Sequence, residues 1–157
     1  MSAEARTRFK IAESVLVVIH SPGLEVLLLE RADRPGFWQS VTGSKEIADE
    51  PLEATCLREV AEETGIVIGS GRVPRERLTD WHRHHDFEIF PVWRHRYAPG
   101  VTRNTEHVFS LEVPRDVTLR LSPREHLRHQ WLDWREAAER CFSATNAEAI
   151  RQLPRRA

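Results

Sequence analysis

The chain has 157 residues, of which 40% are hydrophobic and 30% charged, and its net charge is −1 at pH 7. These values are typical of a single globular domain, here residues 1–157, that folds without a disulfide framework or a structural metal. They exclude a strongly basic surface for nucleic acid, and no apolar run approaches the ~20 residues that a membrane span requires. Residues 1–10 are polar and the two cysteines are isolated, so we expect a cytoplasmic protein.

The first half of the chain predicts a hairpin, a short strand and one long helix. Lys10–His20 is β-branched and apolar at its centre, which indicates a buried strand, and Val26–Glu30 returns after a Ser-Pro-Gly turn. Phe37–Thr42 is expected to form a short aromatic strand. A helix is predicted from Glu50 to about Thr64, because a proline opens it, a glycine follows it, and apolar residues recur every four positions.

The second half is rich in strands. Arg77–His84 and Phe87–Arg96 flank His85-Asp86, which suggests a second hairpin. His82 and His84 would then share a strand face near its tip, where a zinc site is the less favoured interpretation and solvated polar residues the more favoured one. The other expected elements are strands at Glu106–Val113 and Gln130–Asp133 and helices capped by Asp133 and Asn146. Together these elements predict an α/β fold.

The predicted helix at 50–64 carries the most informative side chains. Glu59, Glu62 and Glu63 are spaced i, i+3 and i+4, so their carboxylates share one helix face. Arg58 can reach Glu62 one turn on, but one guanidinium cannot neutralise three carboxylates. The arrangement is explained if Mg²⁺ binds there, since this cation takes oxygen ligands and is commonly completed by substrate phosphates. The alternative is a solvated acidic helix face.

The sequence around this helix resembles the Nudix box, written G-x5-E-x7-R-E-U-x-E-E-x-G-U with U aliphatic. From Gly43 to Ile66 the chain reads G-x6-E-x7-R-E-V-x-E-E-x-G-I. We expect the one extra residue to be absorbed by the loop Ser44–Asp49, which leaves the helical spacing intact, whereas the sequence does not determine the loop's own contact through Glu46. The matching residues are Gly43, Glu50, Arg58, Glu59, Val60, Glu62, Glu63, Gly65 and Ile66.

The resemblance implies a Nudix fold, with a mixed sheet between helices, and a Mg²⁺-dependent hydrolase. Glu59 and Glu63 would be the principal ligands, with Glu62 close by and Mn²⁺ as a substitute for Mg²⁺. Arg58 would hold the glutamates in position. Bound Mg²⁺ would offset charge on phosphate oxygens and lower the pKa of the attacking water.

Three further segments resemble one bacterial subgroup of the family, which removes pyrophosphate from 7,8-dihydroneopterin 3′-triphosphate in folate synthesis and leaves the monophosphate. They read FWQSVTG at 37–43, FEIF at 87–90 and RHRYAPGVTRNTE at 94–106. The resemblance runs from about Lys10 to Asn146. It implies a small-molecule partner, a pterin triphosphate or a nucleoside triphosphate.

Further site residues follow from this narrower resemblance. Glu125 would be an additional metal ligand or the base that activates water. Phe87–Phe90 would line the pterin, where Glu88 is a candidate acceptor for its N–H groups. The implied substrate-binding residues are Lys10, Arg31, Thr42, Phe87, Glu88, Ile89, Phe90 and Ser143. Each also has an ordinary structural interpretation, as core, solvated charge or helix cap.

Two other functions stay open at this point. One is a Nudix pyrophosphohydrolase of ordinary or oxidised nucleoside triphosphates, because a pterin resembles guanine at its hydrogen-bonding edge. The other is an inactive Nudix-like binding module, against which stands the presence of all four residues Arg58, Glu59, Glu62 and Glu63.

Overall fold

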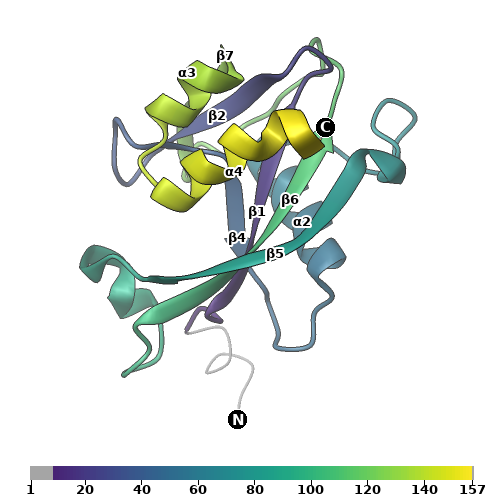
Figure 1. Ribbon diagram of the computed structural model, residues 1–157. Helices are drawn as coiled ribbons and strands as arrows, with labels where there is room; N and C mark the ends of the chain where they lie inside the picture. The colour runs from purple at the N-terminus through teal and green to yellow at the C-terminus, as the bar shows by residue number, and fades with distance from the viewer. Residues whose placement is uncertain (1–8, 157) are drawn as a thin grey trace.

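The computed structural model describes residues 9–156. Figure 1 shows a twisted sheet with helices on both of its faces. The elements in chain order are β1 (Glu13–His20), β2 (Glu25–Arg31), β3 (Trp38–Gln39), β4 (Val41–Ser44), α2 (Leu52–Thr64), η1 (Arg75–Arg77), β5 (Leu78–Glu88), η2 (Pro91–Arg96), β6 (Arg103–Glu112), β7 (His126–Asp133), α3 (Trp134–Arg140) and α4 (Ala144–Arg156).

The sheet is mixed, which confirms the predicted fold class. Its strand order is β3-β2-β1-β6-β5, with β4 paired to β1 and β7 paired to β2. The central strand β1 runs parallel to β6 along its whole length and antiparallel to β4 over Ser14–Val17. It meets β2 only near His20. The sheet therefore forks at the start of β1, where β4 lies beside it in place of β2.

Alternating side chains of β1 and β2 fill two cores, one on each face of the sheet. Val15 and Val17 pack toward α2, where they meet Val60 in one buried cluster. Leu16 and Val18 belong to the opposite cluster, which includes residues of α3 and α4. This period-two pattern is the physical reason that a nearly unbroken apolar strand lies between two helical layers (Figure 1).

The hairpin expected around His85-Asp86 is wrong. Strand β5 runs without a turn through these residues, and its partner is β6, with Phe87 opposite Asn104. A bulge interrupts the pairing between Asp80 and His84, where His82 has a positive φ of 53°. Of the region expected as the second strand, the first two residues end β5, and Pro91–Arg96 forms the 3₁₀ helix η2. The helix begins at a proline, which has no N–H to donate to a strand ladder.

The last helix also differs from the expectation, although Asp133 does cap α3 by accepting a hydrogen bond from the Arg135 N–H at 3.1 Å. Helix α4 begins at Ala144, so Asn146 lies inside it and is not its cap. The Asn146 side chain is buried and binds both the N–H and the hydroxyl of Ser40 at 2.8 and 3.0 Å. It therefore fastens α4 to the β3–β4 connection.

Strand β7 is longer than the expected Gln130–Asp133, because it begins at His126 and pairs with β2 along its length.

Among the described residues, no helix combines the length and the apolar character needed to cross a bilayer.

Candidate active site

The acidic helix face is pressed against strand β4. A Cβ built on Gly43 would lie 2.0 Å from the Glu59 Cδ, so only a glycine leaves room for this carboxylate. Glu59 is 8% exposed and Glu63 is 3% exposed. The start of the box and the middle of its helix are thus held together by direct contact, which buries two carboxylates one helical turn apart.

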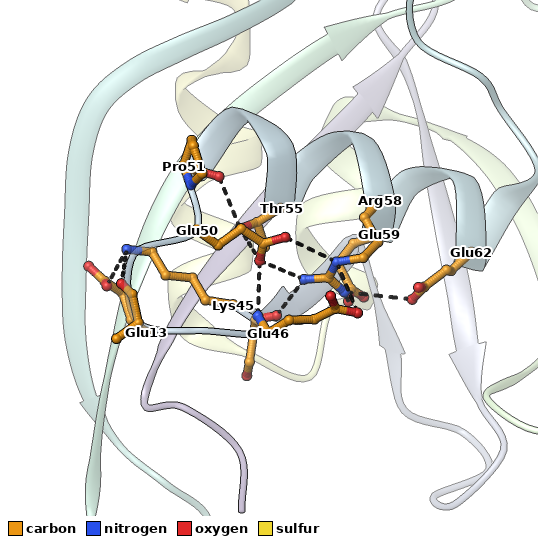
Figure 2. A network of polar contacts seen from close by, with 11 residues as sticks. Glu13, Lys45, Glu46, Glu50, Pro51, Thr55, Arg58, Glu59 and Glu62 are labelled. Carbon is orange, nitrogen blue, oxygen red and sulfur yellow. Dashed lines mark hydrogen bonds and ion pairs between the residues drawn. The ribbon is translucent and has the colours of Figure 1, made fainter. Parts of the chain in front are cut away.

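Arg58 is the centre of the polar network drawn in Figure 2. Its guanidinium donates to both oxygens of Glu50, at 2.9 and 3.3 Å, to the Ser44 carbonyl at 3.0 Å, and to Glu59. Glu62 is at 3.8 Å and half exposed, so it lies at the edge of the network. The hydrogen bonds from Arg58 lower the pKa of Glu50 to about 2, and Glu50 therefore stays ionised.

The extra residue in the box is absorbed by the loop before α2. The Glu46 N–H donates to Glu50 Oε1 at 2.9 Å, and the Glu46 carboxylate lies 3.5 Å from Arg58. Lys45 next to it is paired with Glu13 of β1 (Figure 2). The loop therefore keeps its contact with Arg58, and the i, i+4 spacing of Glu59 and Glu63 is unchanged.

Glu63 is the least satisfied charged group of the site. Its Oε1 is buried without a hydrogen-bond partner among residues 9–156. Burial, and then the neighbouring carboxylate of Glu59, raise its pKa well above the ordinary value, and Glu125 adds to this repulsion. His126 lies 3.7 Å away, but burial lowers its pKa to about 4, so it is neutral near pH 7 and does not compensate the charge.

These groups fit a divalent cation. Two buried carboxylates side by side are costly unless cations or protons compensate both, and within residues 9–156 Arg58 pairs with Glu59 but leaves Glu63 Oε1 without a partner. The ligands are oxygens, which Mg²⁺ and Mn²⁺ prefer. Glu59 and Glu63 can hold such an ion, and Glu125 lines the same cleft from the loop before β7.

This polar cleft has a volume of about 630 Å³. Several cations face the carboxylates across it, and Arg31 among them is held by Asp33 at 2.8 Å and by Gln39 at 3.1 Å. An anion entering the cleft would thus meet both the carboxylates that can hold a metal and a set of cations. We call these cations the basic wall: Lys10, Arg31, Lys45, Arg96 and Arg124. The charged residues that line the cleft are Lys10, Arg31, Asp33, Lys45, Glu46, Glu59, Glu63, Arg96, Arg124 and Glu125.

A second, mostly apolar pocket of about 360 Å³ adjoins the cleft, and we call it the aromatic pocket. Phe90 and Trp93 are stacked at 5.3 Å with an interplanar angle of 11°, and Phe142 packs edge-on against both rings. Arg31 lies 4.3 Å from the centre of the Trp93 ring and borders both spaces. The cleft and the aromatic pocket are therefore one continuous depression with two different walls.

The structure brings the predicted residues together in this depression. Lys10, Arg31 and Thr42 line both parts of it. Glu88 lies at the rim with a 72% exposed side chain, 3.8 Å from Arg94. The predicted residues that line the aromatic pocket are Phe87, Glu88, Ile89, Phe90 and Ser143, the last of which also accepts a hydrogen bond from the Asn146 N–H in the first turn of α4.

Sequence reasoning missed other parts of the aromatic pocket. Trp93 and Phe142 form its ring wall, and Asn104 and Glu106 lie in its buried part. The sequence did contain a signal for Asn104 and Glu106. Residues two positions apart on a strand point to the same face, so both share a face with the apolar residue Val108 and are expected to point to the interior. Nothing in the sequence places Phe142 beside Phe90, because the two are far apart in the chain.

With this geometry established, comparison with known proteins gives the family. The model of the NUDIX domain matches residues 10–153, and the chain belongs to that family. Dihydroneopterin triphosphate diphosphatase of Escherichia coli is 44% identical over 146 residues, which cover 92% of this chain and 93% of the relative. The protein of the same name from Haemophilus influenzae is 40% identical over 153 residues, covering 97% and 93%.

A solved structure agrees with these relatives. The E. coli dihydroneopterin triphosphate pyrophosphohydrolase superimposes with a TM-score of 0.85 and 43% identity, covering 95% of this chain and 99% of that one. The chain is thus a Nudix hydrolase closely related to that enzyme. Nudix hydrolases in general use divalent cations and act on small phosphorylated molecules.

Proposed function

We propose that this protein hydrolyses 7,8-dihydroneopterin 3′-triphosphate to the monophosphate and pyrophosphate, with Mg²⁺ as cofactor. The observation that carries the proposal is the continuous depression, in which buried carboxylates and cations face one space and stacked aromatic rings face the next. A substrate with a polyanionic tail and a flat heterocycle matches both walls. The 40–44% identity to dihydroneopterin triphosphate diphosphatases supports the same substrate.

Glu59 and Glu63 would hold the cation, and Arg58 would keep them in place. When bound, Mg²⁺ offsets the charge that develops on phosphate oxygens and lowers the pKa of a coordinated water. Arg58 fixes the Glu59 carboxylate by a direct hydrogen bond and is itself held by Glu50 and the Ser44 carbonyl. Such outer partners typically matter about 10- to 100-fold for metal affinity or activity.

The basic wall would hold the triphosphate for an in-line attack by water. Lys10 supplies a point charge and Arg31 a planar fork, whose orientation is already fixed by Asp33 and Gln39. Water adds to the α- or the β-phosphorus, the bond from that phosphorus to the oxygen that bridges the two breaks, and the monophosphate and pyrophosphate separate. Glu125 either completes the ligand set or accepts the proton of the attacking water, and both roles fit its position in the cleft.

The aromatic pocket would hold the pterin. Phe90 and Trp93 offer stacked faces, and Phe142 closes the pocket edge-on. Aromatic contacts of this kind contribute about 0.5–1.5 kcal/mol each beyond the area that they bury.

We place the enzyme in the cytoplasm, which is consistent with the free thiols of Cys56 and Cys141 on opposite faces of the sheet.

The test is a comparison of kcat/KM for dihydroneopterin triphosphate, dATP and an oxidised dGTP, with pyrophosphate release as the readout. We expect the pterin substrate to be preferred and all activity to disappear when EDTA removes divalent cations. A preference for either nucleotide would replace the proposed substrate, and absence of release from all three would indicate a binding module.

A further inference from the structure

Two polar side chains of β6 lie buried in the aromatic pocket with unused hydrogen-bonding capacity. Asn104 is 4% exposed and donates to Ser14 Oγ at 2.8 Å, but its Oδ1 is buried without a partner among the described residues. Glu106 is 6% exposed, and its Oε1 accepts from Thr145 Oγ1 at 3.1 Å. Both residues line the pocket, two positions apart on one face of the strand.

Glu106 lacks the arginine partner that two other buried carboxylates have. Glu30 and Glu59 are each paired with an arginine, whereas within residues 9–156 the contact of Glu106 is a neutral hydroxyl, and Glu63 of the polar cleft likewise has no arginine partner there. Burial raises the pKa of Glu106 to about 7, and the hydrogen bond from Thr145 offsets only part of this shift. A buried carboxyl with so little compensation costs stability, which is typical of groups that serve a ligand.

The neighbours of this pair determine what such a ligand must present. Asn104 Oδ1 and the carboxylate of Glu106 are acceptors, so the complementary ligand carries N–H donors. Apolar and aromatic residues, including Leu16, Phe90 and Phe142, form much of the surrounding wall, and Ser14 and Thr145 bind the two side chains from the other residues that line the pocket. A flat ring with adjacent N–H groups on one edge satisfies both requirements, and the 2-amino-4-oxo edge of a pterin is such an edge.

We propose that Asn104 and Glu106 are the specificity-determining pair of this enzyme, which recognise the amino group and the adjacent ring N–H of the bound heterocycle. This inference rests on the proposed function and names the side chains that select the ring. It replaces Glu88 with Glu106 as the carboxylate that meets the pterin, because Glu88 is exposed at the rim and Glu106 lies inside.

The first test measures binding of the heterocycle without its phosphates. Metal-free protein in EDTA at pH 8 is titrated with 7,8-dihydroneopterin, which has no phosphates, and binding is followed by calorimetry. The Glu106→Gln variant keeps the size and the acceptor for Thr145 but loses the charge and turns an N–H₂ toward the ring donors. We expect its Kd to rise about 10- to 100-fold, the loss of one charge-assisted hydrogen bond. The same Kd in wild type and variant overturns the inference, as does absence of binding by the wild type.

The matched control is Glu112→Gln, on the same strand, where Glu112 is paired with Arg77 at the surface. We expect its Kd to equal that of the wild type, and an equal loss in both variants contradicts a specific role for Glu106. Thermal unfolding of each variant establishes that the fold is intact. If Glu106→Gln does not fold, Asn104→Asp takes its place. That variant is isosteric and brings a second negative charge beside Glu106, so we expect a changed Kd.

The second test separates this inference from the proposed function. With dihydroneopterin triphosphate and saturating Mg²⁺, Glu106→Gln is expected to raise KM at least about 10-fold while kcat stays within a few-fold. If the wild type does not prefer the pterin substrate over dATP, the proposed function fails. If the wild type prefers it and the variant keeps the same KM, only the role of Glu106 and Asn104 fails.

Discussion

The two walls of the depression are built by different physical means. In the polar cleft, Glu59 and Glu63 are buried one helical turn apart, burial raises the pKa of both, and Arg58 holds Glu59 in place by a hydrogen bond (Figure 2). In the aromatic pocket, rings pack on one another and polar side chains such as Asn104 and Glu106 lie beside them. The first wall is suited to chemistry on phosphates and the second to recognition of a ring. Substitutions in the cleft should therefore lower kcat, and substitutions in the pocket should raise KM.

The largest effect is expected from Glu63→Gln. It removes the charge of the most buried carboxylate of the cleft, so we expect kcat to fall by more than about 100-fold. This exceeds the roughly 10- to 100-fold loss that is typical when a residue that only holds a metal ligand in place is replaced. The control is Glu62→Gln, which changes a half-exposed neighbour on the same helix. Steady-state pyrophosphate release measures both, and near-normal kcat in a folded Glu63→Gln protein would exclude Glu63 as a metal ligand.

Gly43→Ala tests the close contact between β4 and α2. The new Cβ would overlap the Glu59 carboxylate, whose Cδ lies 2.0 Å from its position, so Glu59 or the strand must move. We expect kcat to fall about 10- to 100-fold, as for a displaced outer partner of a metal site. Gly71→Ala is the control, because no atom of residues 9–156 lies within 4 Å of a Cβ at that position. Equal activity of the two variants would show that the contact is not needed.

A smaller effect, and on KM, is expected from Trp93→Leu. Loss of the stacked ring removes about 0.5–1.5 kcal/mol of aromatic contact, which corresponds to a rise in KM of about 2- to 12-fold with kcat little changed. The measurement is a full kinetic curve with dihydroneopterin triphosphate. A fall in kcat at constant KM would contradict the separation of the two walls.

The last prediction concerns the pH dependence of stability, where we expect the smallest effect on activity. The pKa of Glu106 is about 7 in the folded protein against an ordinary 4.5, so its contribution to stability is complete below about pH 4.5 and is lost as the pH rises through 7. Between pH 5 and 8 the free energy of unfolding of the wild type should therefore fall relative to Glu106→Gln, by on the order of 2–3 kcal/mol. Urea unfolding in EDTA measures this, and parallel curves would contradict the buried titration.

The sequence predicts the two walls unequally, for a physical reason. The carboxylates of the cleft are three or four residues apart on one helix, so their meeting follows from helical geometry alone. Phe90, Trp93 and Phe142 meet through the packing of η2 against the α3–α4 connection, which no local pattern specifies. The hairpin expected at His85-Asp86 failed similarly, since turn-like residues were tolerated inside a bulged edge strand.

The central claim is that Glu59 and Glu63 hold the divalent cation on which hydrolysis depends. Calorimetric titration of Mn²⁺ into the wild type, and into a folded Glu59→Gln, Glu63→Gln double variant, tests it without a substrate. We expect saturable binding at one or more sites in the wild type and its loss in the double variant. Equal Mn²⁺ affinity in both proteins would exclude Glu59 and Glu63 as the metal ligands.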